Sequence, residues 1–261
     1  MLTNSPKYPI VLVHGMMVRD FKIYRAFRKI RNYLSKFDVK VYVTNQDGVG
    51  SIENNAAQLK DEILKILEKE KVEKVNLIAH SKGGLDSRYM ISMLNMDDHV
   101  ASLTTLSTPH HGSKMSARIM KLPKFIASFI AFFINLVFRV FGDKHPDILT
   151  VGKQLSDDYM KGFNKEIVNS NKVYYQSYSS DIDKKATFLV FIPHAFSKRC
   201  EEENTDGVVS ISSSVWGDYQ GHIDVEADHF QMAGIYGGKK KIQEVSSFYL
   251  SIVKELKEKG F

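Results

Sequence analysis

Residues 75–84 read Val-Asn-Leu-Ile-Ala-His-Ser-Lys-Gly-Gly, and this stretch carries the clearest signal for the fold. The apolar run that ends at Ala79 has the composition of a short buried strand, and an apolar pattern with helical spacing begins after the glycine pair. Ser81 therefore falls in a tight turn between a strand and a helix, and the small residues Ala79 and Gly83 allow this turn to close. Such a turn exposes the serine hydroxyl beside the backbone N–H groups at the start of the helix. The sequence thus predicts that Ser81 is a nucleophile.

Four further motifs surround this turn along the chain. A buried strand leads into His-Gly near the beginning, another strand leads into a loop rich in serine and histidine, and two motifs with aspartate follow. In order, they are Pro-Ile-Val-Leu-Val-His-Gly at 9–15, Ser-Thr-Pro-His-His-Gly-Ser at 107–113, Thr-Asp-Gly-Val-Val at 205–209 and Asp-His at 228–229. Together with Ala-His-Ser-Lys-Gly-Gly at 79–84, they resemble the motifs of the bacterial triacylglycerol lipases and related esterases of the alpha/beta-hydrolase superfamily. The resemblance extends from residue 9 to about residue 235, and residues 114–200 carry no matching string.

The resemblance implies a catalytic triad of Ser81, His229 and Asp206. In this triad, His229 takes the proton of the serine hydroxyl and returns it to the leaving alcohol, while Asp206 orients the imidazole and stabilises its charged form. The backbone N–H groups of Met16 and Lys82, each directly after a motif residue, are the expected oxyanion hole. Because these donors belong to the backbone, the methionine and lysine side chains are acceptable at both positions.

Other residues remain as alternatives for the base and the acid. His222 lies seven residues before the expected base and is its main competitor. Asp181 and Asp183 follow a predicted strand at 172–178 and compete with Asp206 for the role of the acid. The remaining motif histidines, His14, His80, His110 and His111, are expected to support loops or to pack behind them. Asp86, in the helix after Ser81, is expected to be a surface or packing residue.

Strand and helix patterns alternate along the chain, which predicts an α/β fold with a mostly parallel central sheet and helices on both faces, as in an alpha/beta hydrolase. Continuous apolar runs such as 10–13 fit strands that are buried on both faces. At 261 residues we expect a single domain over 1–261 with a helical lid or cap insertion at about 114–170. The patterns predict further strands at 39–43, 75–79, 101–106 and 172–178, and helices at 21–34, 56–67, 84–94 and 242–256.

The insertion contains a strongly apolar segment at 122–141. Its charge-free part, from Phe125 to Phe138, is 14 residues long. A membrane-spanning helix needs roughly 20 residues, so we expect no transmembrane span. The segment is either a core helix of a cap or a lid that covers an apolar acyl site in water and contacts a lipid surface. Its position along the chain, where lipases of this type insert lids, favours the lid.

Composition limits the partners of the protein. The net charge of +6 is spread along helices and lacks a basic cluster, so we expect no nucleic-acid partner. Cys200 is the only cysteine, which excludes an intrachain disulfide. The first residues lack the apolar segment of a signal peptide, so a cytoplasmic protein is the default expectation and a secreted mature form is the alternative.

No metal or other cofactor is expected to be required. Many lipases that the sequence resembles hold the loop of the catalytic histidine with calcium, through a carboxylate two residues after that histidine. This position is Gln231 here, and a hard cation prefers carboxylate and carbonyl oxygens. Another branch builds a zinc site from histidine and aspartate residues of an insertion, and those positions have no match in this sequence.

The expected function is hydrolysis of a carboxylic ester through an acyl-enzyme, and a triacylglycerol lipase that acts on fatty-acyl esters is the first choice. A short-chain carboxylesterase is the closest alternative, and a thioesterase or acyltransferase would use the same chemistry. A non-catalytic protein of this fold, which binds a membrane or a partner through 122–141, is the alternative from another class. The presence of Ser81, Asp206 and His229 in their expected contexts argues against it.

Overall fold

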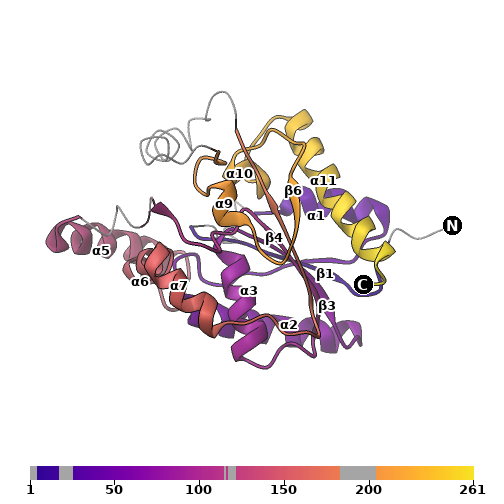
Figure 1. The fold of residues 1–261 in the computed structure, drawn as a ribbon, viewed down its shortest axis with the longest axis horizontal. Coiled ribbons are helices and arrows are strands. Elements are labelled where there is room, and N and C mark those ends of the chain that lie inside the picture. Colours follow the sequence, from indigo (N-terminus) through magenta and orange to yellow (C-terminus); the bar gives the residue numbers. More distant parts are fainter. Residues whose placement is uncertain (1–4, 18–25, 115, 117–121, 183–203) are drawn as a thin grey trace.

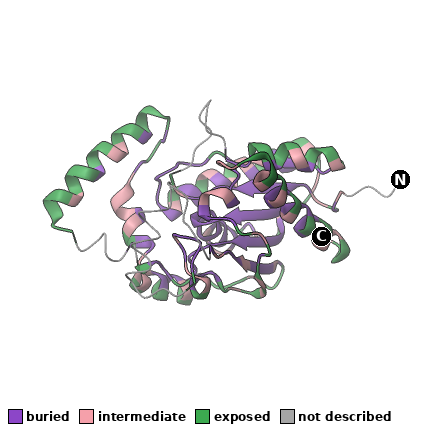
Figure 2. Ribbon diagram, turned by 90° about the horizontal axis from the view of Figure 1, so that it is seen from above, coloured by how far each residue is buried: buried purple, intermediate pink, exposed green. Residues whose placement is uncertain are grey.

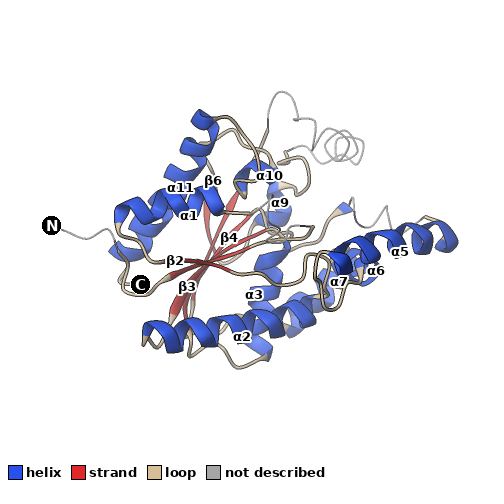
Figure 3. Ribbon diagram, turned by 180° about the vertical axis from the view of Figure 1, so that it is seen from behind, coloured by secondary structure: helices blue, strands red, loops and turns tan. Residues whose placement is uncertain are grey.

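The fold is built on one parallel sheet. The computed structural model describes residues 5–17, 26–114, 116, 122–182 and 204–261. Within them, six strands follow the order β2-β1-β3-β4-β5-β6, and every neighbouring pair is parallel. This result confirms the predicted sheet, and Figure 3 shows its helices on both sides. The strands are β1 (Ile10–Val13), β2 (Val41–Val43), β3 (Val75–His80), β4 (Val100–Leu106), β5 (Tyr174–Ser179) and β6 (Asp218–His222).

Two pairs of helices cover the two faces of the sheet (Figure 1). Strand β1 explains why the central strands are continuously apolar: its residues alternate between the two cores. Ile10 and Leu12 pack with α1 and α11, whereas Val11 and Val13 pack with α2 and α3. The four helices are α1 (Arg28–Leu34), which the 3₁₀ turn η1 (Ser35–Phe37) extends, α2 (Ile52–Glu70), α3 (Lys82–Met93) and α11 (Lys239–Glu258).

The strand order fixes where a site can form. Strand β1 lies between β2 and β3, so the chain leaves β1 towards one edge of the sheet and leaves β3 towards the other. The crevice at the carboxyl ends of two such strands is where open α/β sheets bind ligands. Gly15 follows β1 and Ser81 follows β3, so both residues lie at this point.

Some elements differ from the sequence-based expectations. The helix expected at 21–34 begins at Arg28 in the described part, after Phe27 in a left-handed conformation, and 21–25 lie outside the described residues. Strand β6 was not predicted, because Asp-Tyr-Gln-Gly-His is polar and half-exposed at the sheet edge and carries no apolar alternation. The short helices α9 (Ile211–Ser214) and α10 (His229–Met232) were not predicted either, since neither is long enough to show a helical period.

The expected insertion contains three described helices, which differ in how far they pack against the body. Helices α6 (Ile148–Gln154) and α7 (Asp157–Glu166) join the body through a third apolar cluster that includes Ile52 and Leu85. Helix α5 (Lys124–Val140) instead projects from the body, and only its Ala131 and Phe138 are buried (Figure 2). The interpretation of this segment as a core helix is therefore wrong, while its role as a lid stays a prediction. Among the described helices, none combines the length and the apolar composition that crossing a membrane requires.

Candidate active site

Ser81 occupies a strained turn between β3 and α3. Its φ of +55° and ψ of −134° are rare for a residue with a side chain, and such a conformation costs on the order of 1–3 kcal/mol. Two glycines let the neighbouring loops approach it. A Cβ atom at Gly15 would lie 2.6 Å from the Cβ of Ser81, and one at Gly83 would lie 2.5 Å from the carbonyl oxygen of His14. Gly15 and Gly83 are therefore needed for close contact between the loops after β1 and β3.

The motif at 107–113 supports this turn from the side of β4. The backbone N–H of Ser81 donates to the carbonyl oxygen of Leu106, and the hydroxyl of Thr108 donates to the carbonyl oxygen of Ser81 at 2.8 Å. His110 lies behind this loop, with Nε2 3.0 Å from the hydroxyl of Thr105. Burial lowers the pKa of His110 well below its usual value, so the ring stays neutral. The supporting role expected for His110 fits these contacts.

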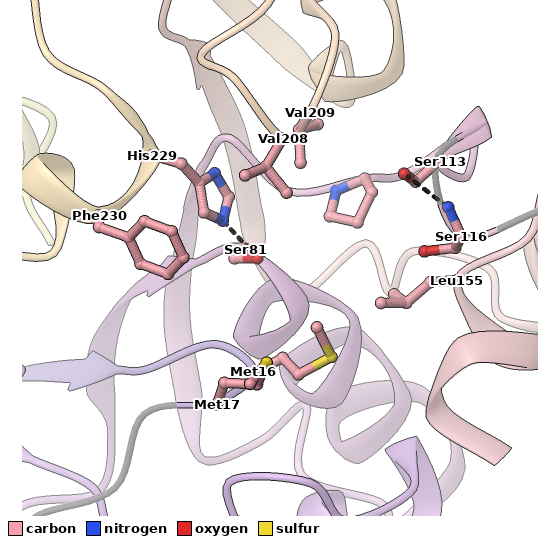
Figure 4. A pocket seen from close by; sticks show the side chains of 11 residues that line it. Met16, Met17, Ser81, Ser113, Ser116, Leu155, Val208, Val209, His229 and Phe230 are labelled. Atoms are coloured by element: carbon pink, nitrogen blue, oxygen red, sulfur yellow. Dashed lines mark hydrogen bonds between the residues drawn. The ribbon is translucent and has the colours of Figure 1, made fainter. Parts of the chain in front are cut away.

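The structure brings Ser81, His229 and Asp206 into one chain of hydrogen bonds. Nε2 of His229 lies 2.9 Å from Oγ of Ser81, as Figure 4 shows, and Nδ1 lies 2.6 Å from Oδ2 of Asp206. The other oxygen of Asp206 accepts the backbone N–H groups of Val208 and Val209 at 3.0 and 2.8 Å. All three residues are buried. Because its two oxygens have separate partners, the carboxylate is fixed with Oδ2 turned towards the imidazole.

The alternative residues lie elsewhere. His222 is an exposed residue at the end of β6, and Asp181 follows β5 outside the hydrogen-bond chain that starts at Ser81. Asp183 lies outside the described residues. Asp86 is a buried packing residue, since its side chain is 1% exposed and lies 2.6 Å from Nζ of Lys82. Of the candidates for base and acid in the described part of the chain, His229 and Asp206 are the ones in the hydrogen-bond chain to Ser81.

His80 packs directly behind the imidazole of His229, with ring centroids 4.5 Å apart. Its ring also makes a T-shaped contact with Phe27, with the ring centroids 6.5 Å apart. Burial lowers the pKa of His80 well below its usual value, and the neighbouring imidazole of His229 lowers it further. His80 is therefore a neutral packing group, as expected for a histidine beside the motif serine, while His14 bonds to the carbonyl oxygen of Gly15 through Nδ1 at 2.9 Å.

Gln231 caps the helix that carries His229. Asp228 is the N-cap of α10 and accepts the backbone N–H groups of Phe230 and Gln231, while the amide oxygen of Gln231 accepts the N–H of Asp228 at 3.1 Å. This capping box closes the N-terminus of α10 at the position where the resemblance led us to look for a calcium ligand. Within the described ranges, no group of three or more histidine, cysteine, aspartate or glutamate side chains is placed to hold a metal ion.

Sequence reasoning missed two buried groups beside the site. Arg88 is 1% exposed, its Nη atoms donate to Oδ1 of Asn164 and the carbonyl oxygen of Ile167, and its guanidinium lies 3.7 Å from the ring centre of Trp216. Burial lowers the pKa of Arg88 to about 9. Asn55 is the second such group and joins Asp86 to the loop after β2. The sequence signal for Asn55 was a polar residue at a position where the helical pattern of α2 places its apolar, buried face.

A mostly apolar pocket opens beside Ser81 and His229 (Figure 4). Side chains from the loops after β1 and β4, from the C-cap of α6, from the aspartate loop and from α10 enclose it. Such a lining accepts hydrocarbon and leaves the polar chemistry to a few groups. The other residues that line it are Met16, Met17, Pro109, Ser113, Ser116, Leu155, Val208, Val209 and Phe230.

The parallel sheet, the strained serine after β3 and the hydrogen-bond chain to an aspartate define an alpha/beta hydrolase. Residues 9–220 match the sequence model of the palmitoyl protein thioesterase family. Triacylglycerol lipase 2 of Saccharomyces cerevisiae is 36% identical over 258 residues, which cover 89% of this chain and 73% of that protein. A triacylglycerol lipase of Pseudomonas fragi is 27% identical over 98% of both chains. The chain therefore belongs to the palmitoyl protein thioesterase family of sequences, and its relatives include triacylglycerol lipases.

The crystal structure of a Staphylococcus hyicus lipase has the same fold. It superposes with a TM-score of 0.76 at 17% identity and covers 97% of this chain and 96% of that one. The predicted superfamily is thus confirmed, and so is the predicted class of enzyme, a carboxylic ester hydrolase that acts on lipids. The roles of the individual site residues stay predictions.

Proposed function

We propose that the protein hydrolyses fatty-acyl esters, triacylglycerols above all, with Ser81 as the nucleophile, His229 as the base and Asp206 as the orienting acid. The hydrogen-bond chain from Oδ2 of Asp206 through His229 to Oγ of Ser81 carries this proposal. With a proton on Nδ1 donated to the carboxylate, Nε2 is the acceptor that faces the serine hydroxyl. This tautomer lets the imidazole remove the hydroxyl proton and activate an otherwise weak nucleophile.

The reaction proceeds in two half-reactions. Oγ of Ser81 attacks the acyl carbon and its proton passes to Nε2 of His229, which then returns the proton to the departing alcohol. A water molecule, activated by the same imidazole, cleaves the acyl-enzyme and releases the fatty acid. In both steps the backbone N–H groups of Met16 and Lys82 stabilise the negative oxygen. Lys82 begins α3, where the first N–H groups have no partner within the helix, and Gly15 brings the Met16 segment against Ser81.

Two observations support a long acyl chain. The pocket beside Ser81 is mostly apolar, and the relatives from Saccharomyces cerevisiae and Pseudomonas fragi are triacylglycerol lipases. The short-chain carboxylesterase is the competing activity within the same chemistry. The family description, palmitoyl protein thioesterase, favours acyl thioesters as a second class of substrate.

The purified protein is expected to release oleate from emulsified triolein, and EDTA is expected to leave the rate unchanged. The second part follows because Gln231 caps α10 by hydrogen bonds that need no cation. Titration of the released acid measures the activity, with p-nitrophenyl butyrate and palmitoyl-CoA as parallel substrates. Turnover of the butyrate ester alone would establish the carboxylesterase instead, and loss of activity in EDTA that calcium restores would contradict a metal-free site.

Helix α5, within 122–141, contacts the lipid surface in this proposal. Its large apolar side chains are turned to solvent, with Phe125 76%, Phe129 66% and Phe132 61% exposed. Exposed apolar patches of this kind are characteristic of interaction surfaces. An oil–water interface buries these side chains without a protein partner, so it suits a helix that projects from the body.

A double substitution, Phe129→Ser with Phe132→Ser, is expected to lower the rate on emulsified triolein by roughly tenfold or more, because two large apolar side chains no longer enter the lipid. The rate on dissolved p-nitrophenyl butyrate should change less than about twofold, since neither side chain lines the pocket. The matched control is Met93→Ser with Val168→Ser, two exposed apolar residues outside α5. Equal losses on triolein in both double variants would remove α5 from the interface.

A further inference from the structure

The loop between β2 and α2 (residues 44–51) is bonded to the segment of one proposed oxyanion donor. Nε2 of Gln46 donates to the carbonyl oxygen of His14 at 2.9 Å, and the backbone N–H of Met17 donates to the carbonyl oxygen of Gly48 at 2.7 Å. These two bonds lie on either side of the donor that follows Gly15. The position of that donor therefore depends on the position of the β2–α2 loop.

The same loop is also connected to the other proposed donor. Nδ2 of Asn55, in α2, donates to the carbonyl oxygen of Asp47 at 2.9 Å and to Oδ2 of Asp86 at 3.2 Å. Oδ1 of Asp86 lies 2.6 Å from Nζ of Lys82, and both side chains are 1% exposed. The backbone N–H of Lys82 is the second donor. An unbroken series of polar contacts thus joins the two donor segments, with Asn55 between them.

Burying the charged groups of this series is costly. Desolvation raises the pKa of Asp86 to about 6, although Lys82 and Asn55 both stabilise its charged form. A buried ion pair adds little net stability compared with apolar packing, and its best-supported use is to specify one geometry. The loop packs tightly against Asn55, since a Cβ atom at Gly50 would lie 2.3 Å from Oδ1 of Asn55 and 2.9 Å from Cβ of Asp47.

The β2–α2 loop is held on its other side by the chain that follows α5. The carboxylate of Asp47 accepts the backbone N–H groups of Lys144 and His145 at 2.9 and 2.7 Å. In return, the carboxylate of Asp143 accepts the backbone N–H groups of Gly48 and Val49 at 3.0 and 2.9 Å. The loop is therefore anchored to the segment after α5 by four bonds, and its link to α3 runs through Asn55.

We propose that Asn55 is a positioning residue of the oxyanion hole: together with the Lys82–Asp86 pair, it sets the separation between the backbone N–H groups of Met16 and Lys82. The inference rests on the proposed function, because it takes these two groups as the donors. Asn55 acts through its neighbours, since it is buried in α2 and does not line the pocket beside Ser81.

Asn55→Leu tests the proposal, because leucine keeps the shape of the side chain and removes both donated hydrogen bonds. We expect kcat for p-nitrophenyl butyrate to fall about tenfold, since small displacements of oxyanion donors weaken transition-state binding, while KM stays within about twofold. The matched control is Asn76→Leu. Asn76 is an equally buried asparagine of β3, bonded to Ser102 at the opposite end of the strand from Ser81. Its variant should lose thermal stability but keep the wild-type kcat.

A thionoester substrate tests the positioning role directly, because its relative rate would not change if Asn55 only stabilised the fold. Sulfur accepts hydrogen bonds from backbone N–H groups weakly, so the ratio of kcat/KM for the butyrate ester and its thionoester reports on the donors. Asn55→Leu should lower this ratio by about the same tenfold as kcat, and Asn76→Leu should leave it unchanged. An unchanged ratio in folded Asn55→Leu, or equal losses in both variants, overturns the proposal.

Asn55→Ser, which retains a small polar group, takes the place of Asn55→Leu if the leucine variant does not fold. Ser81→Ala separates this inference from the proposed function. An inactive Ser81→Ala together with a fully active Asn55 variant refutes only the positioning role. Wild-type activity in Ser81→Ala removes the proposed function and, with it, the basis of the positioning role.

Discussion

Ser81→Ala is expected to lower kcat for p-nitrophenyl butyrate by roughly five to six orders of magnitude and to leave the fold intact. The substitution removes the oxygen that lies 2.9 Å from Nε2 of His229, so the imidazole has no hydroxyl to activate. Alanine keeps the Cβ atom, so the backbone strain of the turn at φ +55° is the same in the variant as in the wild type. Circular dichroism and thermal melting should match the wild type.

The measurement combines turnover with covalent labelling. A p-nitrophenyl phosphonate should label the wild type once, on the peptide that contains Ser81, and should not label the variant. Ser113→Ala is the matched control, since Ser113 also lines the pocket but lies outside the hydrogen-bond chain from His229 to Asp206. We expect its rate to remain within about threefold of the wild type. Labelling of another residue, with activity retained in Ser81→Ala, would contradict the assignment of the nucleophile.

Asp206→Asn should lower kcat by about four orders of magnitude at neutral pH. The geometry gives the reason. Oδ1 of Asp206 accepts two backbone N–H groups, from Val208 and Val209, so the amide oxygen of an asparagine must take this place. The amide NH₂ group then faces Nδ1 of His229 and requires it to be an acceptor. The imidazole proton moves to Nε2, which can no longer remove a proton from Ser81.

Asp181→Asn is the control for the acid, because Asp181 was its competitor along the chain and follows β5 outside the hydrogen-bond chain. Its activity should stay near that of the wild type. For the base, His222→Ala is the control and should keep its activity, whereas His229→Ala should be inactive. If Asp181→Asn loses activity and Asp206→Asn retains it, the acid has been assigned to the wrong loop.

The core of the fold could be predicted because its signals are local or periodic. The turn around Ser81 could be recognised from the small residues Ala79 and Gly83. The close contact with the loop after β1 requires a glycine at 83. The central strands show themselves through continuous apolar runs, since both faces of β1 and β3 are buried. Strand β6 escaped prediction because an exposed edge strand needs no apolar pattern and is held by its backbone bonds to β5.

Elements that depend on a distant partner could not be predicted. Gln231 was recognised as a departure from a calcium ligand, but its bond to the N-cap of α10 appears only when the capping geometry is known. Asn55 and Asp86 are polar residues in two separate helices, and nothing along the chain pairs them. The same holds for Arg88 and Trp216, which lie far apart in the sequence and meet only in the folded chain.

By itself, the sequence determined the strand–turn–helix around Ser81 and the order of the motifs, because backbone sterics and apolar periodicity act over a few residues. The motif at 205–209 favoured Asp206, but only the tertiary structure separated it from its competitor Asp181, since contact with His229 depends on which loops the parallel sheet brings to the crevice between β1 and β3. The tertiary structure also decided that α5 is exposed. The apolar composition of this helix suits either a core or an interface, and in the structure α6 and α7 pack against the body while α5 does not.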